Sequence, residues 1–302
     1  MEKKLSGTAL SKILYEELRN YIVSQSVKPN IVDISIGDDF GSLKYAEMKK
    51  KKIESETGIG FESIHYDDIS KEELIEFINK LNNNVNINGI MLQLPLPGDL
   101  KCFEREILDT IDFRKDVDGL TSTSAGLLMV RSDCLVPCTP KGIIVLLKAY
   151  GVDLEGKTVS IINRSNIVGK PLEQLFLNEN STTIVCHSKT TNLMNITSKS
   201  DIIVAALNKC EYIDSSYVKE GAIVIDVGVH QKEGKIVGDV DFDSVYDKCS
   251  LITPPTGGVG PMTITMLAYN AAKSLYGSEI DDVLNNGIEI ARKTLVKNIR
   301  DV

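Results

Sequence analysis

The chain has 302 residues, about twice the size of a typical single domain, so its length predicts two domains. Its 34 basic and 42 acidic residues leave a net charge of −8, which argues against a nucleic-acid clamp and against binding to anionic membranes. Hydrophobic residues at 42 % and charged residues at 25 % are ordinary globular values, which argues against disorder.

The start of the chain and its cysteines predict a cytoplasmic protein. The first residues, MEKKLSGTALSKIL, are charged and include no apolar stretch of signal-peptide length, and no later segment is apolar enough to span a membrane. Six cysteines without a CxxC pair are too sparse for a disulfide framework, so we expect them to be reduced. The three histidines are far apart and lack zinc-site spacing, so we expect no metal.

In the first half, short runs rich in Ile and Val alternate with helical patterns, which is typical of βα units around a parallel sheet. The predicted strands cover 31–37 and 89–94, with a weaker run at 61–66. Before the second of these, Ser70 and Glu73 form a capping-box pattern at the start of an amphipathic helix.

Four polar residues of the first half are candidates for a site. Tyr45 and Lys49 are four residues apart and share one face of a predicted helix, although a lysine run more often forms a solvated face. Gln93 lies in an apolar strand, where its amide either satisfies backbone groups or faces a ligand. Asp118 lies beside a probable turn, so it is either a functional carboxylate or a turn former.

The second half has the regular pattern of a parallel sheet. Continuous apolar runs predict five strands covered on both faces, at 158–162, 183–186, 201–206, 222–227 and 251–253. Thr139-Pro140 predicts the start of a helix over 142–150 that Gly151 ends, and the domain boundary lies near it. A long helix is predicted from Met262 to about Gly277, followed by an amphipathic tail.

The segment after the first of these strands lies where a Rossmann unit has its phosphate loop. Asn163 and Ser165 stand where glycines are usual, and only Gly169 remains of the GxGxxG pattern. The alternative is an ordinary connection that ends in a helix cap.

The segment after the second strand favours NADP over NAD. Enzymes that bind NAD usually have an acidic residue here for the ribose hydroxyls, whereas this chain has His187, Ser188 and Lys189. Together with Arg164, these side chains can hold a 2′-phosphate. The alternative is a solvated basic turn.

A second glycine loop, TGGVGPMT at 256–263, opens the long helix. Gly257, Gly258 and Gly260 allow backbone amides to approach a ligand at the positive end of that helix. A tight strand-to-helix turn that binds nothing is the alternative.

These motifs, in this order, resemble the bifunctional methylenetetrahydrofolate dehydrogenase/methenyltetrahydrofolate cyclohydrolase family. The resemblance covers about residues 5–276. It rests on Tyr45 with Lys49 and Lys51, GIMLQLPLP, KDVDGL, PCTPKG, NRSNIVGKP, CHSKT, VIDVGV, GDVDF and TGGVGPMT.

The resemblance implies two α/β domains, the second a Rossmann-like parallel sheet, joined by long helices with an active-site cleft between them. Residues 1–140 are expected to form the folate-binding catalytic domain, with the C-terminal helix 262–302 packing back on it. Residues 141–261 are expected to form the NADP-binding domain. The family is generally homodimeric, so we expect a homodimer.

The implied reaction belongs to one-carbon metabolism. NADP oxidises 5,10-methylenetetrahydrofolate to the methenyl compound, which is then hydrolysed to 10-formyltetrahydrofolate. The resemblance implies that Tyr45 stacks on the folate, that Lys49 is the central catalytic residue assisted by Gln93, and that Asp118 hydrogen-bonds the pterin. We expect Lys49 to have a lowered pKa and to act as a base or proton relay.

The resemblance also implies which further residues bind the cofactor and the folate substrate. The expected cofactor-binding residues are Asn163, Arg164, Ser165, Gly169, His187 and Ser188. Besides Tyr45, Gln93 and Asp118, the expected substrate-binding residues are Gly257, Gly258 and Pro261.

The chain departs from the family pattern mainly near the cofactor. Asn163 replaces a glycine, Thr256 a proline and Ser124 an asparagine, and 207–209 replaces a glycine-containing segment. Two alternatives therefore stay open, a monofunctional NADP- or NAD-dependent dehydrogenase and a catalytically silent folate- or nucleotide-binding subunit. The tail beyond about Ser278 extends past the usual end of the family and has no predicted role.

Overall fold

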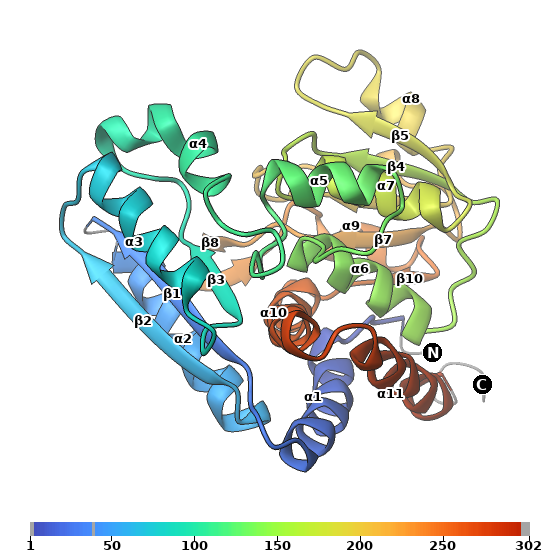
Figure 1. Cartoon of the computed structure of the whole chain (residues 1–302). Helices are drawn as coiled ribbons and strands as arrows, with labels where there is room; N and C mark the ends of the chain where they lie inside the picture. Colours follow the sequence, from blue (N-terminus) through green and yellow to red (C-terminus); the bar gives the residue numbers. More distant parts are fainter. Residues whose placement is uncertain (1–2, 38–39, 297–302) are drawn as a thin grey trace. The chain divides into compact units, whose positions relative to one another are not determined.

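The computed structural model describes residues 3–37 and 40–296, which form two compact units (Figure 1). The three-stranded unit contains residues 14–138 and 264–286. The five-stranded unit contains the described residues of 1–13, 139–263 and 287–302. The division falls within α1 (Gly7–Ser24), α10 (Val259–Tyr276) and α11 (Glu279–Leu295), and also after the first residue of α6 (Cys138–Ala149).

The three-stranded unit is built on a parallel sheet in the order β2-β1-β3. Its strands are β1 (Asn30–Ile36), β2 (Gly60–Tyr66) and β3 (Gly89–Leu92). Its helices are α2 (Phe40–Thr57), α3 (Lys71–Asn83), the 3-10 helix η1 (Gly98–Phe103), α4 (Glu104–Leu108) and α5 (Ser122–Met129). The predicted strands are therefore confirmed, with ends that differ by one or two residues.

Side chains alternate along β1, so its two faces have different environments. Val32 and Ile34 pack in a buried apolar cluster with Leu74 and Ile78 of α3. The predicted capping box fixes the start of α3, because Ser70 Oγ accepts a hydrogen bond from the Glu73 amide while Glu73 accepts one from the Ser70 amide. Apolar packing thus occupies one face of the sheet, and the opposite face lies against α2.

The five-stranded unit contains a parallel sheet in the order β10-β7-β6-β4-β5. Its strands are β4 (Thr158–Ile162), β5 (Thr182–Cys186), β6 (Ile202–Ala205), β7 (Ile223–Asp226) and β10 (Leu251–Ile252), and β8 (His230–Lys232) pairs with β9 (Lys235–Val237) in a separate hairpin. Its helices are α6 (Cys138–Ala149), α7 (Gly169–Asn178), α8 (Leu193–Thr197), the 3-10 helix η2 (Ser215–Tyr217) and α9 (Phe242–Tyr246). The order reverses between β4 and β6, which is a topological switch point where α/β sheets bind ligands. The predicted α/β class with a Rossmann-like parallel sheet is confirmed.

Two helices begin earlier than the sequence predicts. Helix α6 begins at Cys138, before Thr139, and α10 begins at Val259 rather than at Met262. Pro140 and Pro261 therefore lie in the first helical turn, where a missing amide costs nothing because those amides have no intrahelical acceptor. The proline signal located both helix starts to within one turn only.

The ends of the chain differ from the predicted division. The described part of residues 1–13 and of 287–302 belongs to the five-stranded unit, whereas the sequence-based division places both segments with the folate domain. The tail beyond Ser278 forms α11 from Glu279 to Leu295, in agreement with its amphipathic pattern. Among the described residues, no helix combines the length and apolar character needed to cross a membrane.

Candidate active site

Lys49 is buried in the three-stranded unit. It lies on α2 between the buried Ala46 and Ile53, and only 6 % of its surface is exposed, whereas Lys50 and Lys51 of the same run are more exposed. Its Nζ lies 3.8 Å from the sulfur of Met91 on β3. The alternative of a solvated lysine face is therefore wrong for Lys49.

Gln93 follows β3 directly and is held by a carboxylate. Its Nε2 donates hydrogen bonds of 2.7 and 2.9 Å to the two oxygens of Asp33, the middle residue of β1. Asp33 is 1 % exposed, and its burial raises the pKa of the carboxyl, while the Lys49 charge and the Gln93 hydrogen bond act in the opposite direction. Lys49, Gln93 and Asp33 thus form one electrostatically connected group.

Asp33 was not predicted as a site residue. The run NIVDISI predicts a strand, and an aspartate in the middle of a buried strand is rare unless it is paired. The aspartate in this apolar run was therefore the one sequence feature that could have indicated a site residue here.

Asp118 lies in a turn that the hydrogen bonds of the neighbouring Asp116 stabilise. Asp116 is 1 % exposed and accepts hydrogen bonds from the amides of Leu120 and Thr121 and from Ser124 Oγ, at 2.8 to 3.0 Å. Ser124, which departs from the family pattern, is therefore a structural partner of Asp116. The turn itself leaves Asp118 outside this network.

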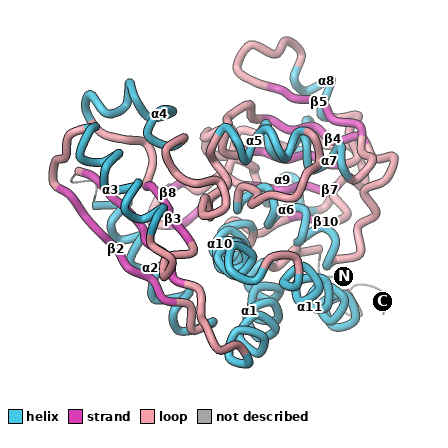
Figure 2. The backbone as a smooth tube through the Cα atoms, viewed as in Figure 1, coloured by secondary structure: helices cyan, strands magenta, loops and turns pink. Residues whose placement is uncertain are grey.

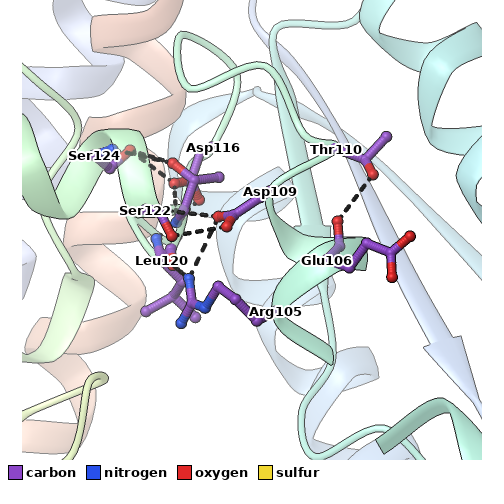
Figure 3. A network of polar contacts seen from close by, with 9 residues as sticks. Arg105, Glu106, Asp109, Thr110, Asp116, Leu120, Ser122 and Ser124 are labelled. Carbon is purple, nitrogen blue, oxygen red and sulfur yellow. Dashed lines mark hydrogen bonds and ion pairs between the residues drawn. The ribbon is translucent and has the colours of Figure 1, made fainter. Parts of the chain in front are cut away.

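A second carboxylate holds the start of α5 (Figure 3). Asp109 accepts hydrogen bonds of 2.7 Å from both the amide and the hydroxyl of Ser122, and Arg105 donates one of 2.7 Å to the Leu120 carbonyl. These contacts anchor the segment on the C-terminal side of Asp118. The position of the Asp118 backbone is thus set by contacts on neighbouring residues.

The Asp118 carboxyl has the character of a weak acid. Burial raises its pKa to about 7, the negative charges of Asp116 and Asp33 act in the same direction, and the Lys49 charge opposes them. Burial also raises the pKa of the Cys138 thiol, which lies in the same electrostatic environment. Lys49, Gln93 and Asp118 are thus brought to one region of the three-stranded unit.

A buried amide on α10 stabilises this region. Asn270, only 1 % exposed, donates hydrogen bonds to the carbonyls of Val117 and Val136 at 2.8 and 2.9 Å. It therefore joins the residue before Asp118 to the segment that precedes α6. Tyr45 lies on α2 as well, but its side chain is outside the described residues, so its stacking role stays a prediction.

Asn163 lies in the connection between β4 and α7, and Figure 2 draws such connections in pink. Its Oδ1 accepts hydrogen bonds from the amides of Ser165 and Gly169 at 2.7 and 3.0 Å, and its Nδ2 donates one of 2.7 Å to the Ala206 carbonyl after β6. Asn163 therefore bridges the ends of the two strands at the switch point. A Cβ on Gly169 would lie 2.2 Å from the Asn163 carbonyl oxygen, so this close turn requires glycine.

Arg164 and the turn after β5 lie at one edge of the five-stranded sheet. Strands β4 and β5 pair in parallel up to their last residues, so Arg164 and Ser188 follow them at the same edge of the sheet. Both side chains are exposed, and among the described residues no carboxylate pairs with Arg164. The turn is closed by a hydrogen bond from the Thr190 amide to the His187 carbonyl and by one from the Lys189 amide to His187 Nδ1. The role of Arg164, His187 and Ser188 in binding a 2′-phosphate stays a prediction.

The second glycine loop has a packing explanation. A Cβ on Gly257 would lie 2.7 Å from Thr8 Oγ1, and one on Gly258 would lie 2.6 Å from the Pro254 carbonyl oxygen. Both positions therefore need glycine for close packing, as the alternative of a tight turn predicts. A substrate-binding role for Gly257, Gly258 and Pro261 stays a prediction.

Within the described ranges, no group of three or more His, Cys, Asp or Glu side chains is placed to hold a metal ion.

Two family models match the chain. The model described as tetrahydrofolate dehydrogenase/cyclohydrolase, catalytic domain, matches residues 5–118, and the model for the NAD(P)-binding domain of the same enzymes matches residues 137–278. The chain belongs to the tetrahydrofolate dehydrogenase/cyclohydrolase family. Lys49, Gln93 and Asp118 all lie in the segment matched by the catalytic-domain model, and the Asn163 loop lies in the segment matched by the NAD(P)-binding model.

Individual relatives in this family cover nearly the whole chain. The bifunctional protein FolD of Clostridium perfringens is 47 % identical over 279 residues, which are 91 % of this chain and 100 % of that protein. A FolD crystal structure from Campylobacter jejuni is 44 % identical with a TM-score of 0.86, covering 89 % of this chain and 97 % of that one. The Trypanosoma brucei structure, described as complexed with NADP cofactor and inhibitor, is 31 % identical with a TM-score of 0.83, covering 89 % and 95 %.

Proposed function

We propose that this chain oxidises 5,10-methylenetetrahydrofolate with NADP to 5,10-methenyltetrahydrofolate and hydrolyses that product to 10-formyltetrahydrofolate. The observation that carries the proposal is the buried Lys49 in one electrostatic group with Gln93 and Asp118, inside the segment that matches the family's catalytic domain. An ammonium and a titratable acid in one buried group can move protons during hydrolysis.

Asp118 is proposed to bind the pterin. A carboxyl with a pKa of about 7 can both donate and accept hydrogen bonds near neutral pH, which suits the donor and acceptor edge of a pterin ring. The hydrogen bonds of Asp116 hold the turn, so the Asp118 carboxyl remains available for the substrate. Gln93 contributes a second polar group, because its amide oxygen is left after Asp33 engages the nitrogen.

Lys49 is proposed to act in hydrolysis. Attack of water on the methenyl carbon releases a proton, and a buried lysine near that carbon can transfer it. The burial of Lys49 limits access of other water molecules. The stacking partner for the folate is proposed to be Tyr45, one helical turn before Lys49 on α2.

The cofactor is proposed to bind at the ends of β4 and β5, where NADP, when bound, supplies the acceptor for the substrate hydride. Arg164, Ser188 and His187 are proposed to hold the 2′-phosphate, because the segment offers a guanidinium and a hydroxyl but no carboxylate. Asn163, Ser165 and Gly169 form the loop at the switch point. The NADP complex of the Trypanosoma brucei relative supports this cofactor.

One assay tests the proposal. The purified full chain is mixed with methylenetetrahydrofolate and NADP, and reduced nicotinamide, methenyl compound and formyl product are followed over time. Formation of reduced nicotinamide with formyl product supports the bifunctional enzyme. If the methenyl compound accumulates and is hydrolysed no faster than without enzyme, the chain is a monofunctional dehydrogenase. If neither NADP nor NAD is reduced, the chain is a silent binding subunit.

A cytoplasmic homodimer is also proposed. None of the six cysteines, all of them among the described residues, forms a disulfide, and three are buried, which supports a reducing compartment. The homodimer follows from the family resemblance and is tested by light scattering coupled to size-exclusion chromatography, where a mass near the 33.2 kDa of one chain would contradict it.

A further inference from the structure

Asp33 is a buried charged group that the proposed reaction does not yet use. It occupies the middle of the central strand β1, pairs in register with Ser63 of β2 and Met91 of β3, and is 1 % exposed. Its neighbours on the same face are Ile31 and Ser35. A carboxylate in this place costs stability unless its partners compensate for lost hydration.

The partners of Asp33 are both residues of the candidate active site. Gln93 donates to both carboxylate oxygens, at 2.7 and 2.9 Å. Lys49 lies close enough for its charge to act on the same carboxyl, and its Nζ contacts Met91, which stands opposite Asp33 across the two strands. Ile34 of β1 also contacts Gln93, because its carbonyl accepts a hydrogen bond of 2.9 Å from the Gln93 backbone amide, whereas Asp33 contacts the Gln93 side chain.

The hydrogen bonds to Asp33 determine the orientation of the Gln93 amide. A carboxylate only accepts hydrogen bonds, so the Gln93 nitrogen must face it, and the amide oxygen must then point to the other side of the amide plane. Without Asp33 the two ends of the amide could exchange places. Since an amide presents a donor at one end and an acceptor at the other, its orientation decides which group meets the substrate or Lys49.

We propose that Asp33 is a positioning residue. It holds the Gln93 side-chain amide with its oxygen directed away from β1, and it places a negative charge close to the Lys49 ammonium. This inference rests on the proposed function. Apolar residues in place of both Asp33 and its partner would suit the middle of β1 better, so the pair is retained at the expense of stability. Asp33 therefore acts through Gln93 and Lys49 and does not touch the substrate.

The test uses two variants of the full chain, Asp33→Asn and Asp33→Val, with Ser35→Ala as the matched control. Ser35 lies on the same face of β1, is buried, and has a hydrogen bond to His65 on the neighbouring strand. We expect Asp33→Val to lower kcat for both reactions by about tenfold to hundredfold, the loss expected for a hydrogen bond to a charged group. The KM for NADP should stay within about twofold, and Ser35→Ala should keep wild-type kcat.

Stability is measured beside kcat, so that a positioning role is separated from loss of the fold. Asp33→Val removes one partner from a buried polar group and takes both acceptors from the Gln93 nitrogen, so we expect its melting temperature to fall. Asp33→Asn retains one acceptor and should show a smaller fall in melting temperature and in kcat. The rates are compared at a temperature at which circular dichroism shows each variant folded. If Asp33→Val does not fold, Asp33→Asn takes its place, and a wild-type kcat in folded Asp33→Asn would then overturn the proposal.

A double-mutant cycle with Gln93→Ala tests whether Asp33 acts through Gln93. We expect Asp33→Val to lower kcat by less than about threefold in the Gln93→Ala background, because the amide that it positions is gone. Equal losses in both backgrounds would overturn the proposal. If the wild-type enzyme is active and Asp33→Val has the same kcat, the positioning role of Asp33 is overturned and the proposed function stands. If the wild-type enzyme itself is inactive, both the proposed function and the positioning role are overturned.

Discussion

Replacement of Asp118 by asparagine is expected to stabilise the protein above neutral pH while it removes folate turnover. In the folded chain, burial raises the pKa of Asp118 from 3.8 to about 7. The folded state therefore prefers the neutral carboxylic acid, and ionisation at higher pH costs stability. Asparagine has the shape of the carboxyl but never ionises, so the variant does not carry this cost.

The size and the pH range of the effect follow from the same pKa. A change from 3.8 to about 7 corresponds to about 4 kcal/mol between the two protonation states. Between these values the folded state binds more protons than the unfolded state, so this group lowers the free energy of unfolding as pH rises. Above pH 7 the full cost is present, and below about pH 4 it vanishes. Asp118→Asn should thus be more stable than the wild type by up to about 4 kcal/mol at pH 8, and nearly equal to it at pH 4.

The measurement is urea unfolding of both proteins across this pH range, with the folate-dependent reduction of NADP as the activity assay. Asp116→Asn is the matched control two residues away. Asp116 accepts hydrogen bonds from two amides and one hydroxyl, so its replacement should lower the free energy of unfolding by about 1–3 kcal/mol. If Asp118→Asn is less stable than the wild type at pH 8, or if their difference does not depend on pH, burial does not control this carboxyl and the reasoning fails.

Three further predictions concern catalysis, the cofactor and a helix end. Lys49→Met should lower the rate of methenyl hydrolysis by about 100-fold or more, measured by loss of the methenyl compound, and a wild-type rate would remove Lys49 from the mechanism. Arg164→Gln should lower kcat/KM for NADP by about tenfold and leave kcat/KM for NAD within about twofold, because only NADP has the 2′-phosphate that the guanidinium contacts. Equal effects on both cofactors would contradict this placement of Arg164. Ser70→Ala should lower the free energy of unfolding by about 1 kcal/mol because it removes the capping box of α3, with unchanged stability in urea as the contrary result.

Most of the fold was predictable because its signals are local. The strands of both sheets appear as apolar runs, and the predicted strand over 158–162 coincides with β4. The capping box at Ser70 is equally local, since both of its hydrogen bonds join residues three apart. The exact starts of α6 and α10 were not predictable, because a proline fits any position of the first helical turn.

The site was only partly predictable, because burial depends on packing between distant segments. Lys49 lies in a run of four lysines in the sequence. The sequence alone could not show that the packing of α2 buries Lys49 and leaves Lys50 more exposed. The pairing of Gln93 with Asp33 joins residues 60 positions apart, across two strands that only the sheet brings together. Asn163 could be recognised as a departure from glycine, but its hydrogen bond to the Ala206 carbonyl depends on the order of the strands.

The charges of the three-stranded unit suit the proposed reaction better than a single catalytic lysine would. Oxidation of the methylene compound creates a positive charge on the one-carbon bridge, whereas the starting compound carries none there. Carboxyls fixed near the reacting carbon would stabilise that developing charge without reorganisation. Asp33 and Asp118 both lie in the field of Lys49, and each offsets its positive charge to the extent that the carboxyl is ionised, which for Asp118, with a pKa of about 7, increases as pH rises through neutrality. With an ionised lysine alone beside the reacting carbon, repulsion would oppose formation of the methenyl cation, and we propose that the ionised carboxyls reduce this repulsion.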